Sequence, residues 1–188
     1  MTGAGRRQPS PSQGWTVSGA QGSGSAHQPR PRPRIQSQVA AGVVAGLAAG
    51  LVMAVGMMAY QYAQGNSIWS NPNLIAVMWM GREVANGELS RATPVGFLTH
   101  MATSGLMGWI AIPFVRDLPP WRTLLVALAY SLASYPLVFA LVLSWANPLM
   151  VERTALIPMT TGHILFGVVL GTVFLWLHPS GPAAAKTG

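Results

Sequence analysis

Four long stretches without Asp, Glu, Lys or Arg constrain this chain more than any other feature. They cover residues 39–60, 95–115, 124–145 and 155–177. A helix that rises 1.5 Å per residue needs about 20 residues to cross roughly 30 Å of hydrocarbon, and each stretch is long enough. Inside lipid a helix also pairs its own backbone polar groups. The pattern predicts an all-α protein, an integral membrane four-helix bundle.

Composition and charge agree with a lipid environment. Hydrophobic residues make up 51% of the chain and charged residues 8%, against about 25% charged in an average soluble domain. The formal net charge is +7, but five of the eleven basic residues precede the first stretch. These are Arg6, Arg7, Arg30, Arg32 and Arg34. Basic residues before a membrane helix fix its orientation and contact anionic headgroups. We therefore expect the lipid bilayer as partner, and no nucleic acid.

The ends of the chain differ in composition from its middle. Residues 1–37 are mostly Gly, Ser, Pro, Gln and Arg, and they lack the apolar residues that would offset the entropy cost of ordering. They also lack the apolar core of a signal peptide. We expect a disordered cytoplasmic tail at 1–37, the membrane domain at 38–178 and a second disordered tail at 179–188.

Basic residues near the helix ends predict the orientation. Five lie on the side that holds both termini and three lie on the other side. The first set is Arg30, Arg32, Arg34, Arg116 and Arg122, and the second is Arg82, Arg91 and Arg153. Because basic loops stay inside, both termini should be cytoplasmic, with residues 61–93 and 146–154 outside.

The first outer loop contains an apolar run at residues 74–81 that is too short to span a bilayer. It follows Asn71-Pro72-Asn73 and carries Trp79. A short interfacial or re-entrant helix fits this pattern, and so does a lid packed over the outer helix ends. Both interpretations stay open at this point.

Other local signals mark the helix boundaries. Thr93 is an expected N-cap with Pro94 in the first turn, and Thr154 is an expected cap of the fourth span. Pro136 falls in the middle of the third span and should kink it.

Small residues at four-residue spacing indicate how the helices pack. Gly42, Gly46 and Gly50 form a ridge on the first span, and Gly167 and Gly171 repeat the spacing on the fourth. Apolar lipid gives helices no hydrophobic reason to associate, so close approach across small residues has to hold them together. We expect the ridge to pack mainly within the bundle, with part of it left for a second copy or another membrane subunit.

Two histidines are the candidate site residues, His100 in the second span and His163 in the fourth. From the expected outer helix ends they lie about 9 Å and 12 Å deep, so they could face each other in the outer leaflet. They could bridge helices by hydrogen bonds, or ligate a b-type haem in space left by Gly96, Ser104 and Gly167. A polar site for a proton, quinone, lipid or metal, or a path for a small solute or ion, is a further interpretation.

The sequence lacks the residues that several kinds of chemistry require. Cysteine is absent, which excludes disulfides and thiolate metal sites. The four acidic residues lie outside the spans, and the chain has no phosphate-binding glycine loop and no H-E-x-x-H motif. Met53, Met57 and Met58 fit gap-filling roles in the core. We therefore expect no enzyme and no cofactor, haem b excepted, but a membrane component that is an accessory subunit or a self-associating bundle.

Four short motifs together carry a resemblance. They are W-S-N-P-N-L-I-A at 69–76, L-T-H at 98–100, N-P-L-M at 147–150 and H-I-L-F-G-V-V-L-G at 163–171. In this order they resemble a group of uncharacterised bacterial four-helix integral membrane proteins, over somewhat more than half of the chain. The group's loop motif is one residue longer, and the Pro and Arg-rich tail is a departure from it. The resemblance implies four helices in the cytoplasmic (inner) membrane of a bacterium and implies no reaction.

Overall fold

The computed structural model describes residue 2 and residues 35–178. The described part is helical and contains no strand. Its elements are α1 (Ile35–Ala63), α2 (Ser70–Met80), the 3-10 helix η1 (Arg82–Val84), α3 (Ala92–Val115), α4 (Pro120–Val138), the π-helix η2 (Phe139–Leu143), α5 (Ser144–Ala146), α6 (Pro148–Arg153) and α7 (Leu156–Leu177). Four segments are long and apolar enough to span a membrane, namely Gln36–Ala63, Ala92–Val115, Pro120–Ala146 and Leu156–Leu177. The predicted all-α four-helix membrane fold is confirmed.

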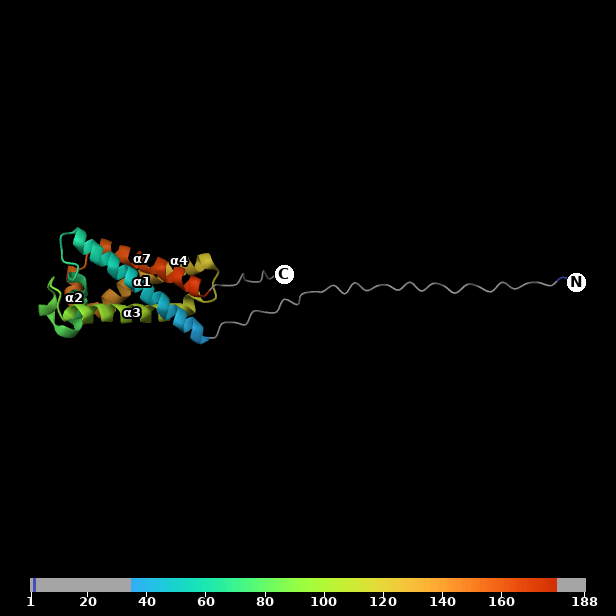
Figure 1. Ribbon diagram of the computed structural model, residues 1–188, viewed down its shortest axis with the longest axis horizontal. Coiled ribbons are helices and arrows are strands. Elements are labelled where there is room, and N and C mark those ends of the chain that lie inside the picture. The colour runs from blue at the N-terminus through green and yellow to red at the C-terminus, as the bar shows by residue number, and fades with distance from the viewer. Residues whose placement is uncertain (1, 3–34, 179–188) are drawn as a thin grey trace. The chain divides into compact units, whose positions relative to one another are not determined.

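The long helices lie side by side, with α1 crossing its neighbours at an angle (Figure 1). α3 and α7 both pack on α1, and α4 packs on α7. We call the end of the bundle that holds residues 64–91 and 147–155 the loop end. The opposite end, with the start of α1, the 116–119 turn and the end of α7, is the terminal end. α1 begins at Ile35, so residues 35–37 are helical, and most of both predicted tails lies outside the described residues.

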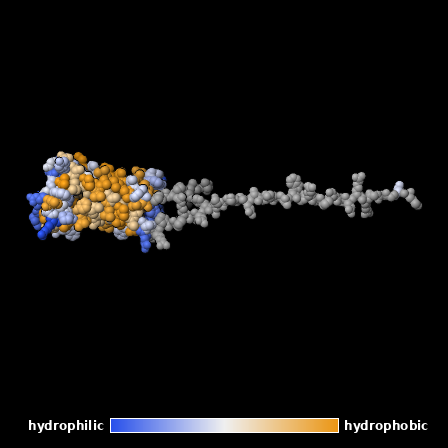
Figure 2. All heavy atoms as spheres, in the orientation of Figure 1, coloured by the Kyte–Doolittle hydropathy of each residue, from blue (hydrophilic) through white to orange (hydrophobic). Residues whose placement is uncertain are grey.

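An apolar band covers the visible side of the bundle between two more polar ends (Figure 2). Large apolar side chains are exposed along all four spans, among them Val55, Leu98, Leu106, Phe114, Leu125, Leu141, Ile164 and Val168. Exposed tryptophans occur near both ends: Trp79 and Trp145 at the loop end, Trp121 and Trp176 at the terminal end. Apolar sides between two tryptophan belts are what a bilayer-spanning protein presents to lipid and headgroups.

The glycine ridge of α1 faces α3 along its whole length. A Cβ atom on Gly46 would lie 2.8 Å from Gly108 Cα, and one on Gly42 would lie 2.9 Å from the Gly108 carbonyl oxygen. A Cβ on Gly50 would meet the Ser104 side chain. The two backbones therefore approach closely across glycine on both sides. No part of the ridge is left for a second copy, which corrects the expectation that some of it would serve assembly.

Gly167 and Gly171 of α7 pack in the same way against α4. A Cβ on Gly167 would lie 2.8 Å from Leu128 Cα, and one on Gly171 would lie 3.2 Å from Ala127 Cβ. Small residues thus form both of these helix contacts, as expected where lipid supplies no hydrophobic drive for association.

The third span changes its helix type three residues after Pro136, at Phe139. Proline has no N–H to donate and its ring clashes with the preceding turn. The backbone continues as the π-helix η2, at whose start the Phe139 N–H donates to the carbonyls of Tyr135 and Pro136. A π-turn inside an α-helix is often found at a functional site, and this one borders the cavity described below.

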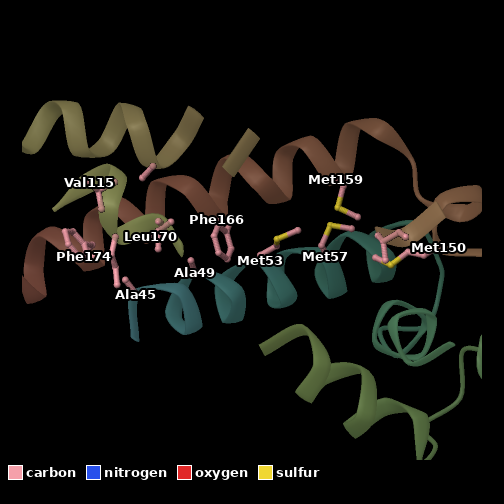
Figure 3. Packing of buried hydrophobic residues seen from close by; sticks show 14 of the residues in the cluster. Ala45, Ala49, Met53, Met57, Val115, Met150, Met159, Phe166, Leu170 and Phe174 are labelled. Atoms are coloured by element: carbon pink, nitrogen blue, oxygen red, sulfur yellow. The ribbon is translucent and has the colours of Figure 1, made fainter. Parts of the chain in front are cut away.

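α2 is packed over the loop end as a lid. Figures 1 and 3 show it end-on, so its axis runs across the bundle. Its buried residues include Leu74, Ala76 and Val77, while the exposed Trp79 donates from Nε1 to Thr99 Oγ1 at 2.9 Å. α2 starts at Ser70, four residues before the apolar run, because proline is tolerated in the first turn of a helix.

Two buried asparagines hold the loop end together. Asn73 Nδ2 donates to the carbonyls of Asn86 at 2.9 Å and Glu88 at 2.7 Å. Asn147 Nδ2 donates to the Leu74 carbonyl at 2.8 Å, and its Oδ1 accepts from the Met150 N–H at the start of α6. Both side chains are completely buried. α2 is therefore joined by hydrogen bonds to the loop that precedes α3 and to the connection between α5 and α6.

Two of the expected helix caps are wrong. α3 begins at Ala92, so Thr93 lies inside it and donates from Oγ1 to Asn73 Oδ1 at 2.7 Å. The residue before α7 is Ala155, which forms no side-chain cap, while Thr154 follows the last residue of α6. Tertiary hydrogen bonding to a buried amide outweighs local capping at Thr93.

The ion pair between η1 and α6 should matter little for stability. Arg82 Nη2 lies 3.2 Å from Glu152 Oε2, and both side chains are more than half exposed. Exposed pairs contribute about 0 to 1 kcal/mol. We expect Arg82→Ala to leave the thermal unfolding temperature in detergent nearly unchanged, at low and at high salt. A large decrease that salt abolishes would contradict this.

Candidate intramembrane binding site

A cavity of about 210 Å³ lies within the loop-end half of the bundle. Residues of α1, α3, α4, η2 and α7 form its walls, and α2 and α6 contribute from the loop end. α3 and α4 contact each other much less than the other neighbouring long helices do. Tyr130 bridges them by donating to the Met107 carbonyl at 3.0 Å. On the loop-end side of this bridge the two helices border the cavity.

Both predicted histidines line this cavity. His100 is eight residues after the start of α3 and His163 seven after the start of α7, so both lie about 11 to 12 Å from those helix starts. His100 Nε2 is 2.9 Å from the Gly50 carbonyl of α1, and His163 Nδ1 is 3.0 Å from the Met159 carbonyl of its own helix. Only the first of these two bonds bridges helices.

Each of these bonds fixes the position of a ring proton. A carbonyl oxygen accepts only, so the facing nitrogen must carry the hydrogen. A neutral imidazole then keeps a lone pair on its other nitrogen, which is Nδ1 of His100 and Nε2 of His163. Neither nitrogen has a hydrogen-bond partner in the described part of the chain. Neither atom is fully buried, so both remain accessible. The two rings therefore offer two uncommitted acceptors.

Methionine dominates the apolar wall. Seven of the ten methionines line the cavity: Met53, Met57, Met58, Met78, Met107, Met150 and Met159. Figure 3 shows Met53 and Met57 of α1 opposite Met159 of α7, with their sulfur atoms directed into the space between the two helices. Gly162 leaves room for them, since a Cβ there would lie 3.0 Å from Met53 Cε and 3.6 Å from Met57 Sδ. Met53, Met57 and Met58 were expected to fill gaps in the core. The expectation did not include that they share one cavity wall with other methionines.

Some of the other polar groups in the wall are already engaged. The hydroxyls of Thr99, Thr103 and Ser134 donate to carbonyls of their own helices. Among the described residues, the Ser104 and Tyr135 hydroxyls have no hydrogen-bond partner. The Tyr135 ring packs on the His163 ring with centroids 5.1 Å apart. A bound molecule would thus meet two hydroxyls, the Asn71 amide, two imidazole lone pairs and several thioethers.

The space expected beside the histidines for haem is partly filled. A Cβ on Gly96 would meet the Pro72 carbonyl of α2, and one on Gly167 would meet the α4 backbone. Neither glycine borders the cavity, although Ser104 does. Nε2 of His100 also faces the Gly50 carbonyl. These contacts correct the slot inferred from Gly96 and Gly167, because α2 and α4 occupy it.

No protein-family model, no curated protein and no solved structure matches this chain. The resemblance to bacterial four-helix membrane proteins stays a prediction. The function has to be inferred from the cavity itself.

Proposed function

We propose that this membrane protein is a non-catalytic binding protein that holds a small ligand inside the loop-end half of its bundle. The observation that carries the proposal is one cavity of about 210 Å³ that brings together both histidines of the spans and most of the methionines. Ligand pockets are mostly apolar, with a few well-placed polar groups that fix orientation. The two uncommitted imidazole nitrogens and the hydroxyls of Ser104 and Tyr135 are such groups.

A purely structural role for the histidines leaves part of this arrangement unexplained. Helix bridging accounts for His100, which reaches the Gly50 carbonyl. It does not account for His163, whose ring bonds within its own helix and whose other nitrogen stays available. Ionisable residues inside a membrane are candidates for function by default.

We also propose that the terminal end faces the cytoplasm of a bacterial inner membrane. The three basic residues of the loop end, Arg82, Arg91 and Arg153, are matched by Glu83, Glu88 and Glu152. The terminal end has Arg116 and Arg122 with a single acid, Asp117. The excess of positive charge on that side favours it as the inner side. The cavity then belongs to the outer leaflet.

The absence of cysteine makes the cavity directly testable with single-cysteine variants. Ser134 lines the cavity, whereas Ser131, one turn earlier on α4, is completely buried and donates to the His163 carbonyl at 2.6 Å. We expect a small uncharged methanethiosulfonate to modify Ser134→Cys in the folded protein, and to leave Ser131→Cys unmodified until the protein is denatured. Intact mass would report both reactions, at a pH near the thiol pKa of about 8.5.

Modification of neither cysteine, with both variants folded by size-exclusion chromatography, would mean that no accessible chamber exists. Equally fast modification of both would mean that α4 and α7 are not packed as described. Either result would overturn the proposed binding function. Selective modification of Ser134→Cys would support it.

A further inference from the structure

Thioether sulfur and imidazole nitrogen are the most numerous uncommitted donor atoms around the cavity. Thioether sulfurs come from α1, α2, α3, α6 and α7, and the imidazoles come from α3 and α7. No Asp, Glu, Lys or Arg side chain borders the cavity. Hard cations prefer carboxylate, carbonyl and water oxygens, whereas thioethers are soft ligands that select Cu(I), and imidazole also suits copper. The cavity therefore has the ligand chemistry of a soft cation site.

The histidines are already arranged as metal ligands usually are. A metal-ligating imidazole almost always donates its other ring N–H to a carboxylate, a backbone carbonyl or water, which fixes the tautomer and raises the basicity of the ligating nitrogen. His163 does this through Nδ1 to the Met159 carbonyl, and His100 does it through Nε2 to the Gly50 carbonyl. Each ring thus leaves one lone pair in a fixed direction.

Three methionines lie along the segment of α7 that carries His163. Met53 and Met57 approach Gly162, the residue before His163, from the facing side of α1. Met159 lies one turn before His163 on α7 and supplies the carbonyl that holds the ring. Figure 3 shows the sulfur atoms of these three methionines in the same region between α1 and α7. Sulfur donors from two helices and the imidazole of His163 therefore line the same cavity beside residues 159–163 of α7.

We propose that this place is a Cu(I) site formed by the thioethers of Met53, Met57 and Met159 and by Nε2 of His163. The inference rests on the proposed binding function, because it names the ligand of the same cavity. All four donors are neutral, so the site suits a monovalent cation better than a divalent one, whose burial in an apolar bundle would cost more. His100 contributes a second imidazole to the same cavity.

Copper binding can be measured with the full chain purified in detergent under reducing, oxygen-free conditions. We expect the protein to take a single Cu(I) ion from the coloured chelator bicinchoninate, read as loss of the absorbance of the chelator complex. Zn(II) should bind far more weakly, because the site has no carboxylate or thiolate. X-ray absorption of the copper-loaded protein should show sulfur neighbours.

Substitutions that keep the side-chain volume separate an effect on copper binding from an effect on folding. Leucine replaces methionine at little cost in stability, so Met57→Leu/Met159→Leu should fold and yet weaken Cu(I) binding by about tenfold or more, as loss of even an outer-shell group can. His163→Phe, which keeps a ring against Tyr135, should do the same. Met80→Leu and Met101→Leu, at methionines outside the cavity wall, should bind as the wild type does.

The outcomes distinguish the two proposals. Failure of the wild type to take Cu(I), together with selective modification of Ser134→Cys, would overturn the copper site and leave the binding chamber standing. Unselective modification would overturn both. Equal losses in Met80→Leu and in Met57→Leu/Met159→Leu would mean adventitious copper on surface thioethers, and would also overturn the site. Weaker Cu(I) binding only in Met57→Leu/Met159→Leu and in His163→Phe would support the copper site.

Discussion

Gly46→Ala is expected to prevent α1 from packing on α3, although the change adds a single methyl group. The new Cβ would lie 2.8 Å from Gly108 Cα and would press on the Ser104 carbonyl oxygen. These are backbone atoms, so no side chain can rotate away, and the two helices would have to separate. Overpacking in a core usually costs about 1 to 3 kcal/mol. We expect at least the upper end of that range here, because separation also weakens the neighbouring contacts of Gly42 and Gly50.

Gly56→Ala is the matched control on the same helix. Its Cβ would meet only Leu165 Cδ1, at an ordinary contact distance of 3.4 Å. Alanine is favoured over glycine in a helix by about 0.5 to 1 kcal/mol, so this variant should be as stable as the wild type or slightly more stable. Thermal unfolding in detergent, followed by tryptophan fluorescence and size-exclusion chromatography, compares the two. Equal unfolding temperatures would contradict the close α1–α3 crossing.

The same comparison separates folding from assembly. If the ridge joined protomers, Gly46→Ala would yield a folded protein with altered crosslinking. If it joins α1 to α3, the fold itself is lost, and any change in crosslinking is secondary. The described contacts predict the second result, because Gly42, Gly46 and Gly50 all face α3.

The membrane spans could be predicted because each one is recognisable from its own residues alone. A long uncharged stretch pairs its own backbone groups, so its helical state in a membrane does not depend on its neighbours. The loop end is different, because its structure comes from distant partners. Asn73 reads locally as a turn residue, but it bonds to residues 86, 88 and 93. Thr93 reads locally as a cap, but its hydroxyl donates to the buried amide of Asn73.

The candidate site was only partly predictable for the same reason. The sequence singles out His100 and His163, because titratable groups are rare in spans. It does not reveal the methionine wall, since helical spacing says which residues share a face and not what lies opposite them. The partner of the glycine ridge was also missed. Ser104 and Gly108 are small residues four apart on α3, a spacing that would have indicated the face meeting Gly46.

Asn73→Leu is expected to destabilise the lid at the loop end more than any other polar substitution. Asn73 is completely buried, donates to the carbonyls of Asn86 and Glu88 and accepts from the Thr93 hydroxyl. Leucine has a similar volume but leaves these partners unpaired. Of the three partners only Thr93 is a buried residue. An unsatisfied buried polar group costs about 1 to 3 kcal/mol, so a loss of about 1 to 3 kcal/mol in unfolding free energy is expected.

Asn71→Leu tests whether that loss is specific. Asn71 is two residues away on the same helix, borders the cavity and has no hydrogen-bond partner among the described residues. Its replacement should change the unfolding free energy by less than about 1 kcal/mol. Unfolding in mild denaturant, followed by tryptophan fluorescence, measures both variants. A loss for Asn71→Leu as large as that for Asn73→Leu would contradict the hydrogen-bonded anchor.

The lid also connects this anchor to the cavity. α2 lines the cavity through Pro72, Ile75 and Met78, so a loosened α2 should open it more often. Asn73→Leu combined with Ser134→Cys should therefore be modified by the thiol reagent faster than Ser134→Cys alone, at temperatures where both proteins are folded. Asn71→Leu combined with Ser134→Cys should be modified at nearly the rate of Ser134→Cys alone. Any difference should come only from the replaced side chain at position 71 of the cavity wall. Unaltered labelling in the Asn73 variant, despite lower stability, would mean that ligands enter between α3 and α4 without movement of α2.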